Sequence, residues 1–309
     1  KQKGLSTLEQ IEQDAVATFG AEHPEVQGIR VMLGQLLQED GQYPQAENWY
    51  KKALDGFVEA LGAGHPFALE TSHRLATVEE LQGKYGEAAQ VLLNACAGAD
   101  KVLGRFHHLT GVCFKQLGLM NFRMGDSVKS RFAYGRASKI LRAVGGKGYP
   151  GYIQSQIYLA DLARVGADFP EAERVLSRVI DSELTSDTLK FEAKAVMAQL
   201  FEDQGLYPEA EGETQAILQR EVETLGEMHP NAITSLNNLA GLRRKQSRFF
   251  EAEKGYELAL ERFSQTAGED HPSTIAVMNN LARTLENQGL YDRAEPLFRK
   301  ALKSSAKVL

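Results

Sequence analysis

The stretch HPNAITSLNNLAGLRRKQSRFFEAE, residues 229–253, recurs as HPSTIAVMNNLARTLENQGLYDRAE at residues 271–295. The two copies begin 42 residues apart, and the pair His-Pro opens two further segments with the same separation, at His23 and His65. Self-similarity at a fixed period of this length is typical of repeat architectures. The period therefore predicts degenerate copies between residues 65 and 229.

Counting in that period places seven repeats, numbered here in chain order. They start near residues 23, 65, 107, 149, 187, 229 and 271. Position 10 after each start is leucine or methionine, and position 11 is always glycine or alanine, as a close crossing of two helices requires. The fourth repeat is four residues short, close to one helical turn, so we expect its second helix to shorten in phase. We assign residues 1–22 to a single N-terminal helix, half a repeat, and residues 23–309 to the seven repeats.

Glycines divide each repeat into two helices. One glycine recurs at position 18, as in Gly41 and Gly83, and a second at position 39, as in Gly62 and Gly226. The left-handed conformation that ends a helix suits glycine. Apolar or small residues recur three and four apart between these breaks. We therefore expect an all-α fold, a right-handed superhelical solenoid of antiparallel helix pairs without strands.

The motifs of each repeat resemble those of the tetratricopeptide repeat. They are Leu-x-x-Leu-Ala, as at residues 236–240 and, with Met278 in the first place, at residues 278–282, followed by Gly-x-Tyr and Glu-Ala-Glu. The 42-residue form that ends in Leu-Gly-x-x-His-Pro is similar to kinesin light chain and its relatives, and the pattern covers about residues 6–303. The resemblance implies a module that binds a protein or peptide in an adaptor or scaffold role, and not an enzyme.

The resemblance also implies where a partner would bind. In tetratricopeptide repeats the first helix of each pair lines a concave surface, with groove-facing side chains near positions 5, 8, 9, 12, 15 and 16. In this sequence those side chains include Asn237, Asn238, Arg244, Lys245, Asn279, Asn280 and Arg283, and, in repeats two and three, His73, Arg74, Lys115, Gln116 and Arg123. Amides can bond a peptide backbone and cations can meet carboxylates, so we expect a peptide with acidic residues. The alternative is that Asn238 and Asn280 only bond neighbouring helices.

Repeat three concentrates positive charge in a chain whose net charge is −6. Residues 115–147 carry eight lysines and arginines against the single acidic residue Asp126. In the second helix of this repeat the cations are Lys129, Arg131, Arg136, Lys139 and Arg142. Tyr134 and Leu141 mark the buried side of that helix, so these cations predict an exposed basic patch on the convex surface. It would meet an anionic partner or remain a solvated face.

Composition excludes several other classes of protein. Apolar residues make up 43% and charged residues 25%, as in ordinary soluble folded chains. No apolar run approaches the roughly 18 residues of a membrane-spanning helix. The negative net charge makes a nucleic-acid partner unfavourable, and Cys96 and Cys113 are too few for a disulfide framework. We expect an intracellular, cytoplasmic protein without membrane insertion.

The histidines at the repeat starts do not predict a metal site. Each lies one repeat from the next and precedes a proline that starts a helix, which indicates a structural role. Gly145-Gly146-Lys147-Gly148 lacks the spacing of a phosphate-binding loop. We predict no catalytic residue, metal or cofactor.

The last repeat is not followed by a polar capping helix, which solenoids normally need. We therefore expect Phe298 and Leu302 to be partly exposed. The chain would then be a fragment of a longer protein, or would self-associate through its uncapped ends. The alternative function is accordingly a self-associating scaffold or a regulatory repeat domain of a larger protein.

Overall fold

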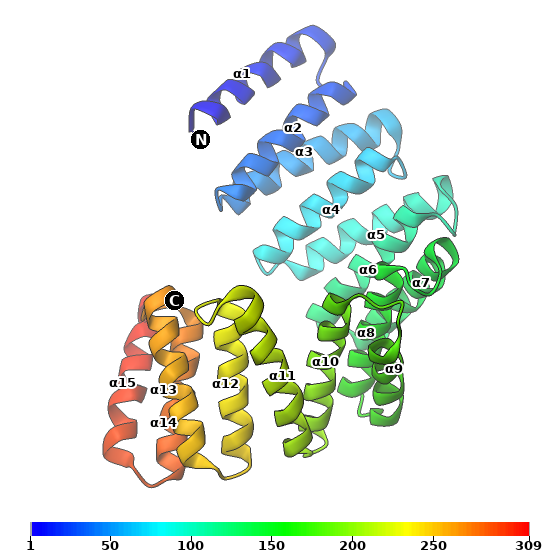
Figure 1. Ribbon diagram of the computed structural model, residues 1–309. Coiled ribbons are helices and arrows are strands. Elements are labelled where there is room, and N and C mark those ends of the chain that lie inside the picture. Colours follow the sequence, from blue (N-terminus) through cyan, green and yellow to red (C-terminus); the bar gives the residue numbers. More distant parts are fainter. Residues whose placement is uncertain (1, 309) are drawn as a thin grey trace. The chain divides into compact units, whose positions relative to one another are not determined.

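The computed structural model describes residues 2–308, and every regular element in that range is an α-helix (Figure 1). The helices are α1 (Gln2–Phe19), α2 (Pro24–Glu39), α3 (Tyr43–Leu61), α4 (Pro66–Leu81), α5 (Tyr85–Val102), α6 (His108–Arg123), α7 (Ser127–Gly145), α8 (Pro150–Val165), α9 (Phe169–Asp181), α10 (Asp187–Asp203), α11 (Tyr207–Leu225), α12 (Pro230–Lys245), α13 (Phe249–Thr266), α14 (Pro272–Asn287) and α15 (Tyr291–Val308). The prediction of an all-α helical repeat solenoid is confirmed. The shortened helix of repeat four is α9, with 13 residues against 18 or 19 in the other second helices.

The helices form two compact units. Unit 1 comprises the chain up to Leu162 together with Glu183–Ser186, and unit 2 comprises Ala163–Ser182 and the chain from Asp187 onward. Inside each unit successive helices run in opposite directions and pack on one another (Figure 1). The first helices of adjacent repeats also meet, α4 with α6 and α12 with α14. The division into seven repeats and a half repeat stays our proposal for how the chain is organised.

The histidines of the repeat starts cap the helices that follow them. In all five such repeats the ring Nδ1 accepts a hydrogen bond from the backbone N–H two residues later, at 3.2–3.3 Å. The capping histidines are His23, His65, His107, His229 and His271. The bond satisfies one of the free N–H groups at a helix start. These residues therefore have the structural role that the sequence indicated.

The end of each first helix requires a left-handed residue. Five glycines occupy position 18 with φ between 74° and 77°, and Gly41 and Gly205 are examples. In repeats four and six the same position holds Ala167 (φ 60°) and Ser247 (φ 61°). A side chain in this region costs roughly 1–2 kcal/mol. These two turns keep the repeat geometry at the expense of local strain.

The small residue at position 11 allows the two helices of a repeat to approach closely. A Cβ atom added to Gly34 would lie 2.7 Å from the ring of Tyr50, and one added to Gly118 would lie 2.8 Å from the ring of Tyr134. Both tyrosines occupy position 27 of their repeats and are fully buried. The two helices therefore cross closely, as predicted, and in these two repeats a tyrosine ring of the second helix packs against the glycine backbone of the first helix.

Replacing Gly118 by alanine tests this contact. We expect Gly118→Ala to lower the free energy of unfolding by about 1–3 kcal/mol, because the new methyl group overlaps Tyr134. Gly135→Ala on α7 is the matched control, since an added Cβ there meets nothing within 4 Å. Alanine is the better helix former, so the control should gain up to about 1 kcal/mol. Urea unfolding of both variants measures the difference, and shifts of the same sign would contradict the placement.

Candidate functional site: a groove in unit 2

A cavity of about 380 Å³ lies in unit 2 among α10, α11, α12, α13 and α14. Helix α12 contributes more lining residues than any other helix. Its lining includes five side chains to which the sequence assigned peptide contact: Asn237, Asn238, Arg244, Lys245 and Asn280. Asn279 and Arg283 lie on the same helix as Asn280 but are not part of the lining. This cavity is the groove discussed below.

A short chain of amides crosses the groove from α14 to α12. Asn280 Nδ2 donates to Asn237 Oδ1 at 3.1 Å, and Asn237 Nδ2 donates to Asn238 Oδ1 at 3.2 Å. The first bond links two helices, which is the structural role that the sequence left open for these residues. Asn238 is the last of the three hydrogen-bonded amides, and its side chain is exposed to solvent. The amides are thus held in place by one another.

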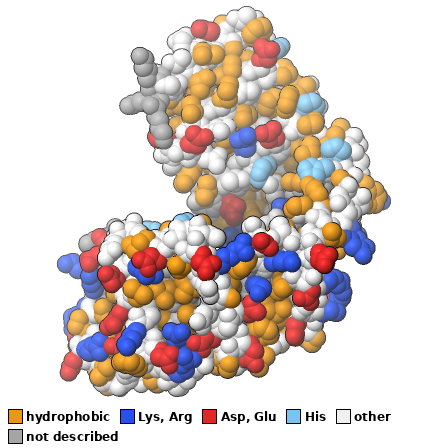
Figure 2. Space-filling view, viewed as in Figure 1, with side chains coloured by type: hydrophobic (Ala, Val, Ile, Leu, Met, Phe, Trp, Pro, Cys, Tyr) orange, Lys and Arg blue, Asp and Glu red, His pale blue; other side chains and the backbone are white. Residues whose placement is uncertain are grey.

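The charged residues of the groove balance in sign. Lys245 Nζ lies 2.6 Å from Glu202 Oε1, so this cation is already paired. Arg244 lies beside the Tyr256 hydroxyl; burial raises the pKa of Tyr256 and the guanidinium opposes that rise. With Glu221, the lining holds two cations and two carboxylates. Figure 2 shows a similar mixture of acidic and basic side chains on one face of unit 2.

Two buried polar atoms of the groove have no partner. Arg244 Nε and Glu221 Oε2 are both shielded from solvent, and neither has a hydrogen-bond partner within the described part of the chain. A buried donor or acceptor without a partner costs about 1–3 kcal/mol. Both residues belong to the lining of the groove.

The predicted residues of unit 1 also meet, but they bond to one another. Gln116 of α6 hydrogen-bonds His73 of α4, and the two are 43 residues apart, as Asn280 and Asn237 are in unit 2. Partial burial, followed by the nearby cations Arg74 and Lys115, lowers the pKa of His73. The face is therefore built in the same way as that of unit 2.

The cations of that face are engaged as well. Arg74 donates to Glu70 at 2.9 Å, and Lys115 donates to Gln154 at 2.6 Å. Arg123 is exposed, and its Nε lies 3.5 Å from Glu80. The groove of unit 2 is the stronger candidate, because five of the predicted side chains line one cavity there.

A family model for the tetratricopeptide repeat matches residues 25–101 and 232–307. The chain belongs to the tetratricopeptide repeat family. This confirms the resemblance that the motifs indicated. No curated protein matches the chain. Across residues 2–308, no helix combines the length and apolar character needed to cross a membrane.

Solved structures of other repeat proteins are similar. A tetratricopeptide repeat protein from Parabacteroides merdae is 16% identical, with 90% of this chain and 93% of that chain covered at a TM-score of 0.61. The apo form of the quorum sensor NprR from B. thuringiensis is 14% identical, with 91% and 88% covered at 0.56. A variant of a Podosopora anserina protein, assigned as a kinesin light chain with nearly identical TPR-like repeats, is 20% identical, with 78% and 95% covered at 0.39. Identities this low show the fold alone.

The basic patch of this tetratricopeptide repeat protein differs from expectation at Arg136. Its guanidinium is half-buried, lies 4.2 Å from the centroid of the Phe114 ring, and donates to Asp100 of α5. The prediction that Arg136 is exposed was wrong, because the side chain packs on Phe114 and pairs with Asp100. Asp100 lies outside residues 115–147, the segment from which the patch was predicted. Lys129, Arg131, Lys139 and Arg142 are exposed.

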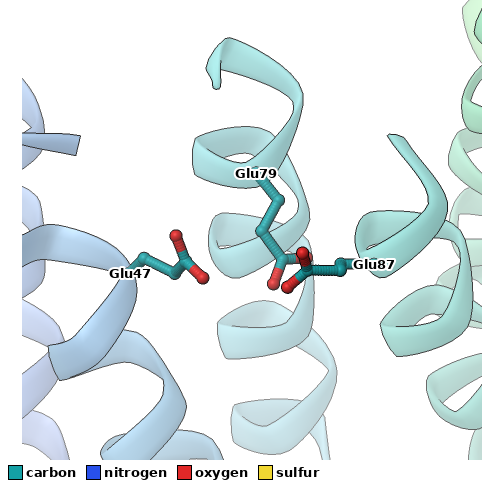
Figure 3. A group of neighbouring side chains, drawn as sticks. All are labelled: Glu47, Glu79 and Glu87. Atoms are coloured by element: carbon teal, nitrogen blue, oxygen red, sulfur yellow. The ribbon is translucent and has the colours of Figure 1, made fainter. Parts of the chain in front are cut away.

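Three carboxylates of unit 1 form a cluster that no motif predicted. Glu47 of α3, Glu79 of α4 and Glu87 of α5 each place an oxygen within 4.8 Å of the others (Figure 3). Lys51 Nζ lies 2.6 Å from Glu47 and 3.4 Å from both Glu79 and Glu87. The ammonium group thus already lies where a metal ion would bind the carboxylates. Burial raises the pKa of Glu79, and Lys51 opposes that rise.

Glu47 also belongs to an inter-repeat contact that recurs along the tetratricopeptide array. A glutamate of one second helix accepts a hydrogen bond from a glutamine 35 residues later, at 2.7–2.8 Å. The pairs are Glu47 with Gln82, Glu211 with Gln246, and Glu253 with Gln288. A cation also pairs with each glutamate: Lys84 lies 2.7 Å from Glu47, Arg248 lies 2.6 Å from Glu211, and Arg293 lies 2.7 Å from Glu253. The glutamate that follows the recurring alanine, the last residue of Gln-Ala-Glu or Glu-Ala-Glu, therefore joins consecutive repeats.

Sequence reasoning missed Glu221, Glu202 and Tyr256 in the groove. The family pattern places binding side chains on first helices, whereas Glu221 and Tyr256 come from the second helices α11 and α13. The Glu–Gln pairs could have been found from the sequence, because glutamate and glutamine are 35 residues apart in each of the three pairs. No comparable signal exists for Glu221.

The low pKa of Glu47 makes its contribution to stability depend on pH. Burial alone would raise this pKa, but hydrogen bonds from Lys51, Lys84 and Gln82 together lower it from 4.5 to about 2. Its contribution is therefore complete above the unfolded value and is lost as pH falls from about 4.5 through about 2. We expect Glu47→Gln to reduce the free energy of unfolding by about 1–3 kcal/mol at neutral pH, and by less in acid.

Urea unfolding at about pH 7 and about pH 3 measures the change. Glu59→Gln, on the exposed side of the same helix, is the control and should alter stability little at either pH. A pH-independent difference between Glu47→Gln and the unmodified chain would contradict the ion network.

Proposed function

We propose that the groove of unit 2 binds an extended segment of another polypeptide, and that the chain acts as an adaptor or scaffold. Membership of the tetratricopeptide repeat family supports a protein partner. The open cavity along α10, α12 and α14 supplies the space, and its lining combines amides with few charges. We propose no catalytic role for any of its residues.

The observation that carries this proposal is the pair of unsatisfied atoms in the groove. Arg244 Nε–H lacks an acceptor and Glu221 Oε2 lacks a donor among the described residues. A peptide unit offers both groups, a carbonyl oxygen and an N–H. Binding such a unit would replace two buried penalties by two hydrogen bonds, each to a charged group and worth more than an ordinary one. The exposed Asn238 amide would continue the pattern along the segment.

We expect the bound peptide to carry fewer acidic residues than the sequence alone suggested. Glu202 and Glu221 in the lining would repel a strongly acidic segment, and Lys245 is neutralised by Glu202. Of the two cations in the lining, Arg244 is the one for which no carboxylate partner is found within residues 2–308. We therefore propose a segment with a single Asp or Glu near Arg244 and otherwise neutral residues. Only one ion pair is formed and salt screens it, so affinity should fall only modestly as ionic strength rises.

Self-association is the second candidate, and one observation favours it. Leu302 of α15 is 73% exposed, whereas Phe298 packs against the apolar core of unit 2. Leu302 and Tyr291, which is 66% exposed on the same helix, offer apolar surface that a second copy of the chain would cover. Sedimentation at increasing concentration distinguishes this function from binding in the groove.

Alanine substitution of the two groove asparagines tests the proposed function. A peptide selected by the unmodified chain from a displayed library of random linear peptides serves as the probe. We expect Asn238→Ala with Asn280→Ala to weaken its binding by about 1–3 kcal/mol, because hydrogen bonds to a partly desolvated backbone are lost. The free energy of unfolding should change by less than about 1 kcal/mol, since the fold loses only the Asn280–Asn237 bond and the exposed bond between the adjacent residues Asn237 and Asn238.

Asn231→Ala with Asn287→Ala is the matched control. Both residues are exposed, both belong to α12 or α14, and neither lines the groove. Titration calorimetry should show unchanged binding for this pair. Equal affinities of the two double variants would place the peptide on another surface, and unfolding of the Asn238/Asn280 variant would assign the asparagines to the fold.

A further inference from the structure

A second cavity, of about 340 Å³, lies in unit 1 along α2 and α4. Its walls are apolar and come from Val31, Phe57 and Phe67. The two rings lie 5.6 Å apart between centroids in a tilted arrangement, and Phe67 is 53% exposed. An exposed aromatic ring at the edge of an apolar hollow offers surface that a partner can cover.

The backbone of α2 is bare on the side that borders this cavity. Gly28 belongs to the lining, and a Cβ atom built there would meet nothing within 4 Å. Every other residue type would place side-chain atoms in that space. Glycine lowers helix stability by roughly 1 kcal/mol relative to alanine. The open space at Gly28 therefore enlarges the hollow at a position where the helix alone would favour a side chain.

The charge around this hollow is acidic. Glu25 and Glu70 are the charged members of its lining, and both are exposed. Glu70 pairs with Arg74 at 2.9 Å, whereas no ion pair is found for Glu25 among the side chains that the structure describes. The hollow thus combines an apolar interior with a carboxylate at its edge that is available to a cation.

We propose that this hollow binds a large apolar side chain, phenylalanine or leucine, from a partner segment that carries lysine or arginine beside it. Burial of the apolar side chain supplies most of the affinity. The exposed cation beside Glu25 contributes selectivity and the rate of association more than affinity. The site is independent of the groove of unit 2, and it selects the opposite charge.

Short peptides provide the probe. The first is Lys-Lys-Phe-Lys-Lys; the second replaces Phe by Ala, and the third replaces all four lysines by Glu. Each is titrated into the full chain labelled at its valine methyl groups, and the Val31 signals report occupancy of the hollow by NMR. We expect the first peptide to shift them at the lowest concentration, the glutamate peptide to bind several-fold more weakly, and the alanine peptide to leave them unchanged.

Gly28→Leu tests the location without removing a contact of the fold. The new side chain fills the hollow and raises helix propensity, so the variant should stay folded and bind the first peptide about tenfold or more weakly. Gly135→Leu, at an equally open glycine of α7, is the matched control and should bind normally. Circular dichroism of both variants verifies folding.

The test of this hollow can fail or succeed independently of the test of the groove in unit 2. The Asn238→Ala with Asn280→Ala chain should still bind Lys-Lys-Phe-Lys-Lys, whatever it does with its own selected peptide. Absence of Val31 shifts, equal binding of the lysine and glutamate peptides, or unchanged binding by folded Gly28→Leu would each overturn the assignment.

Discussion

The close crossing of the two helices in each repeat is the constraint on which the rest of the structure depends. At Gly34 and Gly118 a tyrosine ring occupies the space where a side chain would begin. Because interiors are packed as tightly as crystals, this contact fixes both the distance and the register of the pair. The left-handed turns then join the two helices of a pair, and the histidine caps begin the first helix of a pair. Each repeat can therefore vary its surface while keeping its frame.

That frame explains how the groove arises. When first helices of adjacent repeats lie side by side, positions 8 and 9 meet across the gap, as Asn237 and Asn280 do. The same positions meet in unit 1, as His73 and Gln116. The two units therefore bring the same repeat positions together, but the side chains at those positions differ. In unit 2, Arg244 and Glu221 line an open cavity and each has one atom without a partner among the described residues. In unit 1, Gln116 bonds His73 and Lys115 bonds Gln154, but Arg74 Nε is likewise without a partner.

Periodicity made the fold predictable, because buried positions recur every 42 residues and each copy corroborates the others. The shortened α9 and the capping histidines followed from the same counting. The groove was predictable only where it uses first helices. Glu221 comes from a second helix, and the partner of Arg136 is Asp100 of a neighbouring repeat. Pairings between different repeats depend on side-chain reach, which a single sequence reveals only where the pair itself recurs, as for Glu47 and Gln82.

A crystal structure of the chain with a peptide that it selects from a displayed library tests the central claim most directly. The account predicts the peptide extended along α12 in unit 2, with a backbone carbonyl accepting from Arg244 Nε and a backbone N–H donating to Glu221 Oε2. A selected peptide bound elsewhere, for example along the exposed cations of α7, with both groove atoms still unpaired, would contradict it.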